Sequence, residues 1–156
     1  MIVTVRLSSR RVLTVVGILA WIVLAAFALR GARWAYAIFL LLGLFWILGS
    51  AGFHLHRPDC EGLVSFDLAL FSLTNYKHIF LFGVFFLMTR VQLGRARHAL
   101  LLAAAATIAM GVLIELEEGA TNRNCRLRDL APDTVGAFLG AVVYHAWRRP
   151  HAAAAS

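Results

Sequence analysis

Charged side chains are scarce in this sequence, where Asp, Glu, Lys and Arg together make up only 15% of the residues. Hydrophobic residues make up 61%, whereas soluble domains are about half apolar and about a quarter charged. A water-soluble fold of 156 residues with this composition would have too few polar side chains to cover its surface. A lipid bilayer removes this difficulty because it is itself apolar. The composition therefore favours an integral membrane protein with no separate soluble domain.

Cysteine and the common catalytic motifs are also scarce. The chain has 2 cysteines, Cys60 and Cys125, which are too few for a disulfide scaffold but enough for one bridge if both face an oxidising compartment. There is no Gly-rich phosphate loop, no nucleophile elbow and no His-Glu-x-x-His zinc motif. The histidines lack a defined metal-ligand spacing and no Cys-x-x-Cys pair is present. We therefore expect neither a metal nor another cofactor.

Long apolar runs fill most of the chain. A spanning helix needs about 20 consecutive apolar residues, and the runs that approach this length cover residues 12–29, 34–53, 77–93, 99–116 and 133–147. The stretch 63–73 is too short to span and is better explained as an interfacial or re-entrant segment. We predict an all-α fold, a polytopic transmembrane helix bundle of about five spanning helices, because a bilayer accepts only helices or closed barrels. Residues 1–156 then form a single membrane domain.

The basic residues gather at the ends of the apolar runs, and the formal net charge is +7. Arg30 and Arg33 lie in a short connection that predicts a tight helical hairpin, and more arginines follow in segments 90–98 and 148–149. This distribution is typical of membrane-flanking charge and leaves no soluble basic face for nucleic acid. The positive-inside rule favours a cytoplasmic C-terminus, although the N-terminal arginines oppose it. In either orientation the two cysteine-containing loops share one side, because two predicted spans separate them.

Three polar groups lie on that same side, and ionisable residues beside a membrane span need a reason to be there. The first is Lys77-His78 at the start of the third span. Snorkelling of a long side chain to the interface explains Lys77. His78 is a candidate base, since a helix N-terminus disfavours a positive imidazole. The alternative is an interfacial histidine with no catalytic role.

The second group ends the fourth span. Glu115 and Glu118 are three residues apart and share a helix face with Gly111, one turn earlier. Carboxylates at a helix C-terminus oppose the macrodipole and repel each other, so they require cations, a ligand or solvation. Solvation explains Glu117 adequately, whereas Glu115 lies deeper and is a stronger candidate for a functional role.

The third group is the segment that leads into the last span. Its candidate site residues are two arginines and two aspartates, Arg123, Arg126, Asp129 and Asp133. The alternative for either aspartate is a cap of the following helix. Gly136 and Gly140 share a stripe with Asp133, and their small-xxx-small spacing lets another helix backbone approach closely.

These residues form an ordered set that resembles a known family. The third span opens with Lys77-His78-Ile79-Phe80 and the fourth ends with Ile114-Glu115-x-x-Glu118, after which come Arg123, Asp129, Asp133, Gly136-Ala137 and Gly140-Ala141. Their order and spacing resemble the VanZ-like family of small membrane proteins, named for a teicoplanin-resistance protein, over residues 75–149. This chain departs from the family by having Glu118 in place of Gln, Asp133 in place of Asn and Tyr76 in place of Asp. The first two runs, residues 12–53, and the His54–Gly62 loop have no clear family counterpart.

The resemblance implies a protein of the bacterial plasma or inner membrane that is linked to low-level glycopeptide resistance and cell-envelope processes. The family positions that carry over to this chain are His78, Glu115, Glu118, Arg123, Asp129 and Asp133. In such a cluster we expect Asp129 to orient His78 as a general base. We expect Lys77, Arg123 and Arg126 to bind an anionic lipid-linked or cell-wall substrate.

Two alternatives to this function remain at the level of sequence. In the first, the protein is a non-enzymatic membrane module whose polar cluster locks the helices together or docks a partner protein. In the second, it is a small transporter, which is disfavoured because no predicted span carries an ionisable residue at its midpoint. The residues do not decide between an enzyme and a binding protein.

Overall fold

The computed structural model describes residues 9–50, 60–61, 65–121 and 125–153. Their helices follow the order α1 (Ser9–Leu29), α2 (Arg33–Ser50), α3 (Phe66–Ser72), α4 (Tyr76–Leu93), α5 (Ala99–Ala120), the 3-10 helix η1 (Leu127–Asp129) and α6 (Leu130–Ala153). Within these ranges the extended backbone pairing consists of one isolated parallel bridge between Glu61 and Arg126. The all-α fold predicted from the apolar runs is therefore confirmed.

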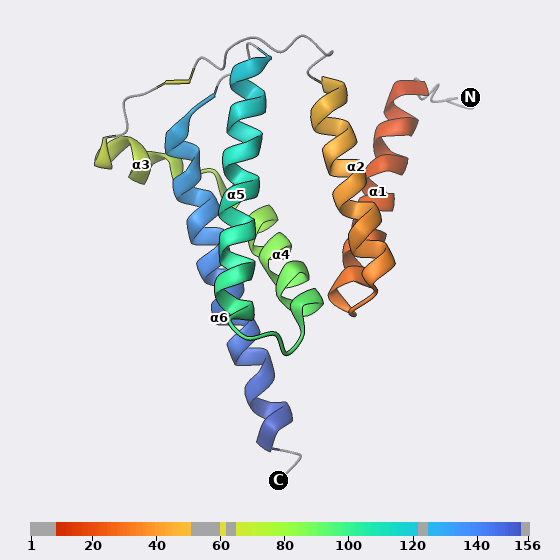
Figure 1. Ribbon diagram of the computed structural model, residues 1–156. Coiled ribbons are helices and arrows are strands. Elements are labelled where there is room, and N and C mark those ends of the chain that lie inside the picture. The colour runs from red at the N-terminus through yellow and green to blue at the C-terminus, as the bar shows by residue number, and fades with distance from the viewer. Residues whose placement is uncertain (1–8, 51–59, 62–64, 122–124, 154–156) are drawn as a thin grey trace, which may run out of the picture.

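Helices α4, α5 and α6 pack together, and the α1–α2 hairpin lies on one side of them (Figure 1). The most extensive interface joins α4 to α6. Helix α3 lies on the other side, where it contacts η1 and α6. The α1–α2 turn and the α4–α5 loop are at the same end of the bundle, opposite to the end of α5 and the start of α6 (Figure 1).

Glycines set the close approach of α4 and α6. A Cβ added to Gly136 would lie 2.5 Å from the carbonyl oxygen of Ile79, and one added to Gly140 would lie 2.9 Å from the carbonyl oxygen of Gly83. Both distances fall below ordinary van der Waals contact, so the two backbones touch where side chains would otherwise separate them. The close helix approach predicted from Gly136 and Gly140 is confirmed, and Gly83 of α4 completes it.

The α1–α2 hairpin turns at Gly31, whose φ of 90° lies in the left-handed region that favours glycine. Two polar contacts connect this hairpin to α4. The hydroxyl groups of Tyr36 and Thr89 are 2.8 Å apart, and Gln92 Nε2 donates to the carbonyl oxygen of Ala28 at 2.7 Å. The tight connection expected from the short link is present, and the hairpin is tied to the rest of the fold by hydrogen bonds in addition to apolar contact.

Each predicted apolar run coincides with a helix, but several boundaries differ. Helix α5 continues beyond residue 116 to Ala120, and α6 begins at Leu130 and ends at Ala153, outside the predicted 133–147. The short segment expected at 63–73 is α3, Phe66–Ser72. Residues 51–53 of the second run and 63–64 of the short segment lie outside the described residues. The α6 boundary moves because η1 leads into the helix without a break.

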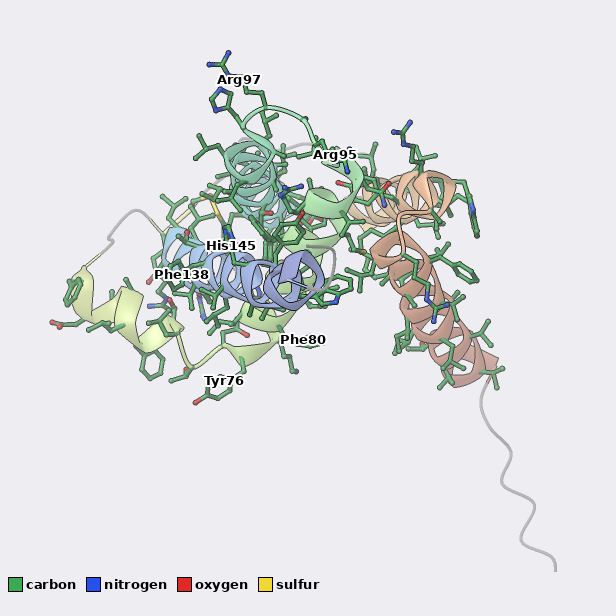
Figure 2. All side chains as sticks on the ribbon, turned by 90° about the horizontal axis from the view of Figure 1, so that it is seen from below. Tyr76, Phe80, Arg95, Arg97, Phe138 and His145 are labelled. Atoms are coloured by element: carbon green, nitrogen blue, oxygen red, sulfur yellow. A yellow bond between two sulfur atoms is a disulfide. The ribbon has the colours of Figure 1, made fainter. Side chains whose placement is uncertain are left out.

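One helix of the described chain, α5, is long and apolar enough to cross a membrane. Helices α3 and α4 meet the same criterion only as a pair, which is bent by 78°. Large apolar side chains are nevertheless exposed on several helices, including Phe45, Phe80, Leu101 and Phe138. Phe80 and Phe138 extend outward from α4 and α6 (Figure 2).

Candidate functional site

A histidine–aspartate pair connects the first turns of α4 and α6. His78 Nδ1 lies 2.8 Å from Asp133 Oδ1, and their side chains are 27% and 2% exposed. Beside an ionised carboxylate, which only accepts hydrogen bonds, Nδ1 is the donor, and in the neutral tautomer the basic nitrogen is then Nε2. Phe82, one turn later in α4, stacks on the imidazole with ring centroids 5.9 Å apart. The ring is thus held in one orientation by a buried acid and an aromatic neighbour.

This pairing corrects the expectation that Asp129 orients His78. Asp129 ends η1 and is half-buried, whereas Asp133 lies within the first turn of α6. Asp133 shares its helical stripe with Gly136 and Gly140, which pack on α4. The face of α6 that contacts α4 therefore carries Asp133 to the start of α4, where His78 is.

Helix α5 leaves room for the second oxygen of Asp133. A Cβ added to Gly111 would lie 2.5 Å from Asp133 Oδ2 and 3.3 Å from a methyl carbon of Leu130. Only a glycine at position 111 lets the aspartate occupy this space without displacing either helix. The sequence places Gly111 on the face that Glu115 shares, and the structure shows that this face points towards α6.

Glu115 is buried in the same region, with 2% of the residue exposed. Its Oε2 accepts a hydrogen bond from the backbone N–H of Arg126 at 2.7 Å. Arg126 immediately precedes η1, so the carboxylate satisfies a backbone donor at the start of that helix. Glu115 therefore positions the segment that carries Arg126, and we infer a structural contribution in addition to the predicted site role.

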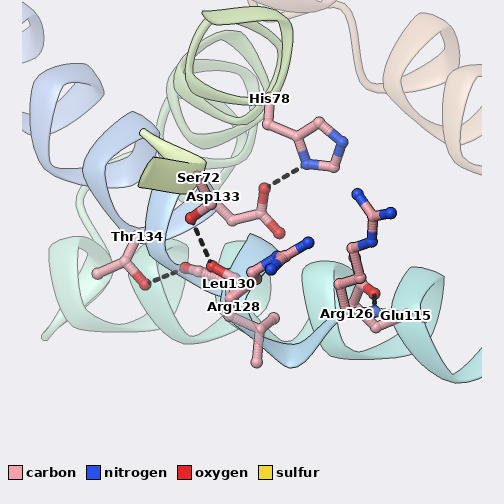
Figure 3. Close-up of polar contacts among 8 residues, drawn as sticks. All are labelled: Ser72, His78, Glu115, Arg126, Arg128, Leu130, Asp133 and Thr134. Carbon is pink, nitrogen blue, oxygen red and sulfur yellow. Dashed lines mark hydrogen bonds and ion pairs between the residues drawn. The ribbon is translucent and has the colours of Figure 1, made fainter. Parts of the chain in front are cut away.

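Two arginines face the space beside the His78–Asp133 pair. The guanidinium groups of Arg126 and Arg128 extend towards the side of the cluster where His78 lies (Figure 3). Their nearest described carboxylate is Glu61, whose Oε2 is 3.9 Å from Arg126 Nε and 3.8 Å from Arg128 Nη2. The Arg128 side chain is 17% exposed and that of Arg126 is 43% exposed. The arrangement is a partly accessible pair of cations next to an oriented imidazole.

The disulfide between Cys60 and Cys125 holds the outer part of this site. The Cα atoms of the two cysteines are 4.7 Å apart. Next to it, the N–H of Glu61 donates to the carbonyl oxygen of Cys125 at 3.1 Å, and Glu61 forms its isolated bridge with Arg126. The two cysteine-containing segments, which the sequence predicts to share one side, are covalently joined.

The remaining predicted site residues make none of the contacts described above. Lys77 is exposed, Glu118 and Asp129 are half-buried, and Arg123 lies outside the described residues. Ser72 of α3 donates from its hydroxyl to the carbonyl oxygen of Arg128 at 2.8 Å, which fixes the other side of η1. In the part of the chain that the structure describes, no three His, Cys, Asp or Glu side chains are placed to hold a metal ion.

Sequence reasoning did not select Arg128 or Glu61. The pattern Arg126-x-Arg128 could have indicated the second arginine, because alternate residues of extended backbone point to the same side. Glu61 could have been found from the disulfide, since a residue that follows one bridged cysteine lies near the residue that follows the other. Comparison with protein-family models, with curated proteins and with solved structures finds no match.

Proposed function

We propose that the chain is a multi-pass membrane protein in which α1, α2, α4, α5 and α6 cross the bilayer and α3 lies near its surface. The exposed apolar side chains on α1, α2, α4, α5 and α6 support this proposal. A soluble monomer rarely exposes a contiguous apolar patch larger than a few hundred Å². Surrounding lipid satisfies these surfaces, and the glycine contacts between α4 and α6 suit helix packing in a membrane.

The distribution of arginines favours one orientation. Arg30, Arg33, Arg95 and Arg97 belong to the α1–α2 turn and the α4–α5 loop, which share one end of the bundle (Figures 1 and 2). The positive-inside rule places that end in the cytoplasm. The disulfide end then faces the outer compartment, where an oxidising environment maintains the bridge.

The function that we propose is VanZ-like: binding of an anionic, lipid-linked or cell-wall substrate at the outer membrane face, as part of glycopeptide tolerance. One observation carries the proposal. Arg126 and Arg128 face the side of the cluster with His78, whereas the buried acids Asp133 and Glu115 hold the scaffold by hydrogen bonds. Guanidinium groups bind phosphate and carboxylate oxygens through several N–H donors, which fits an anionic headgroup at a membrane surface.

The same geometry is compatible with processing of the bound substrate. His78 is oriented through Nδ1 by a buried carboxylate, as a general base is in hydrolytic enzymes, and its Nε2 is left to accept a proton. Binding and processing are separated by one measurement: a processing enzyme releases a product from the lipid-linked substrate, and loses this activity in His78→Ala while binding is retained.

The test of the binding proposal uses the two ends of the molecule. We expect Arg126→Gln/Arg128→Gln to abolish the increase in teicoplanin tolerance that the wild-type protein confers when it is expressed in a susceptible bacterium. The control is Arg97→Gln, which removes one charge from an exposed position at the opposite end and leaves Arg30, Arg33 and Arg95 there to maintain the orientation. Loss of tolerance in the control, or full tolerance in the Arg126/Arg128 variant, contradicts the proposal.

A second candidate function is a non-enzymatic module whose polar cluster locks the helices. The observation that favours it is that His78–Asp133 ties α4 to α6, while Glu115 ties α5 to the segment before η1. The two functions differ in which variant loses protein. If His78→Ala, which removes the α4–α6 contact, lowers membrane accumulation together with tolerance, the locking function is supported. If Arg126→Gln/Arg128→Gln keeps wild-type accumulation and melting temperature while tolerance is lost, the binding function is supported.

A further inference from the structure

A single carboxylate oxygen lies beside both arginines of the proposed site. Glu61 Oε2 is 3.9 Å from Arg126 Nε and 3.8 Å from Arg128 Nη2. Both separations exceed the about 2.7–2.9 Å of a charge-assisted hydrogen bond. The Glu61 side chain is 54% exposed, so solvent screens both pairs. The acid lies close to both cations without binding either tightly.

The backbone around Glu61 explains how it remains there. Cys60, its neighbour, is bonded to Cys125, the neighbour of Arg126. The Glu61 N–H donates to the Cys125 carbonyl oxygen at 3.1 Å. These two links keep the carboxylate next to the guanidinium groups at a high effective concentration, as a short linker does for a tethered ligand.

Resting on the proposed anion site, we infer that Glu61 is a tethered internal ligand of Arg126 and Arg128, and that the diphosphate group of a lipid-linked substrate displaces it. A diphosphate carries oxygens on two phosphorus centres. It can therefore reach two separate guanidinium groups at hydrogen-bond distance at the same time. The two oxygens of one carboxylate share a single carbon, which is consistent with the long contacts that Glu61 makes to both arginines.

The chemistry of diphosphate and carboxylate favours replacement of Glu61 by the substrate at the two arginines. Diphosphate brings more negative charge and more acceptor oxygens than a carboxylate, so it gains more from two guanidinium partners. Glu61 is largely exposed and returns to water when it is displaced. Its role is then to lower the affinity of the arginine pair for weakly charged anions and to select those with several oxyanions.

The experiment measures binding of farnesyl diphosphate and of inorganic diphosphate to the purified full chain in detergent micelles. We expect Glu61→Gln to bind farnesyl diphosphate about 2- to 10-fold more tightly than the wild type, which is the range that loss of two weak exposed pairs allows. The matched control is Asp67→Asn, which removes the same charge from an exposed position in α3. Glu61→Ala should show the same increase, and a free-thiol titration verifies that the disulfide remains in each variant.

The outcomes separate this inference from the proposed function. If the wild type binds neither diphosphate, or if Arg126→Gln/Arg128→Gln keeps wild-type affinity, the proposed anion site itself is wrong. If binding requires the arginines but Glu61→Gln matches the wild type or Asp67→Asn, only the tethered-ligand inference is wrong. Farnesyl diphosphate should bind more tightly than inorganic diphosphate, and equal affinities would overturn a lipid-linked source of the group.

Discussion

Replacement of Gly136 by alanine tests whether the α4–α6 contact determines both stability and the geometry of the site. The added methyl carbon would lie 2.5 Å from the Ile79 carbonyl oxygen and 3.0 Å from the Gly83 nitrogen. The first distance is about 0.9 Å shorter than the 3.4 Å at which ordinary contact begins. Both neighbouring atoms belong to the backbone, so no side chain can rotate away and the helices must separate.

The expected cost of this separation is about 1–3 kcal/mol, the range measured when methyl groups are forced into packed interiors. Asp133 lies one turn before Gly136, so the same movement lengthens its hydrogen bond to His78. We expect Gly136→Ala to lower the melting temperature in detergent and, if the proposed function holds, the teicoplanin tolerance as well.

Gly17→Ala and Gly43→Ala serve as matched controls, because a Cβ at either position meets nothing within 4 Å. Alanine has the higher helix propensity by roughly 1 kcal/mol, so these two variants should be as stable as the wild type or more stable. Melting is followed by size-exclusion chromatography of heated samples. A Gly136→Ala protein that melts with the controls would refute the close helix contact.

Three further predictions concern the polar contacts. Asp133→Ala should lower stability by about 1–3 kcal/mol and reduce substrate binding, because the Nδ1–H of His78 loses its acceptor, and thermal melting with a binding titration measures both effects. Glu115→Ala should destabilise the chain by a similar about 1–3 kcal/mol, since the buried N–H of Arg126 loses its acceptor, whereas Glu115→Gln retains an acceptor oxygen and should cost less. Cys60→Ser/Cys125→Ser removes a cross-link between residues 65 apart in the sequence. Its loss should cost up to about 4 kcal/mol by loop-closure entropy, so reductant should lower the melting temperature of the wild type but not of this variant.

Much of the fold was predictable because apolar residues dominate the chain. Runs long enough for helices, the short link before α2 and the small residues Gly136 and Gly140 predicted helices, a hairpin and a close contact, and each is present. The number of membrane spans stays a prediction. By length and hydropathy the described residues support one spanning helix, α5, or two if α3 and α4 count as one bent span.

The site was only partly predictable. The orientation of α6 about its own axis, and so the face that it turns to α4, depends on the short 3-10 helix η1 that precedes it. Asp129 and Asp133 are four residues apart, so a continuous helix would place both on one face. Residues 127–129 form a 3-10 helix instead, which has a different number of residues per turn and breaks that periodicity. Helical periodicity therefore could not show which aspartate reaches His78. Glu61 was missed for another reason: its place depends on a disulfide between segments far apart in the chain.

The site is acidic by composition, and burial explains how it can still present cations to the anion that we propose it binds. Asp133 and Glu115 are buried, and each uses its carboxylate to accept a hydrogen bond from His78 or from the Arg126 backbone. A carboxylate that is buried and paired contributes little field at the surface compared with an accessible guanidinium. Arg126 and Arg128 are partly exposed and face a single described carboxylate, which is itself largely in solvent. A count of acidic residues in the sequence therefore overstates the negative charge close to these two guanidinium groups.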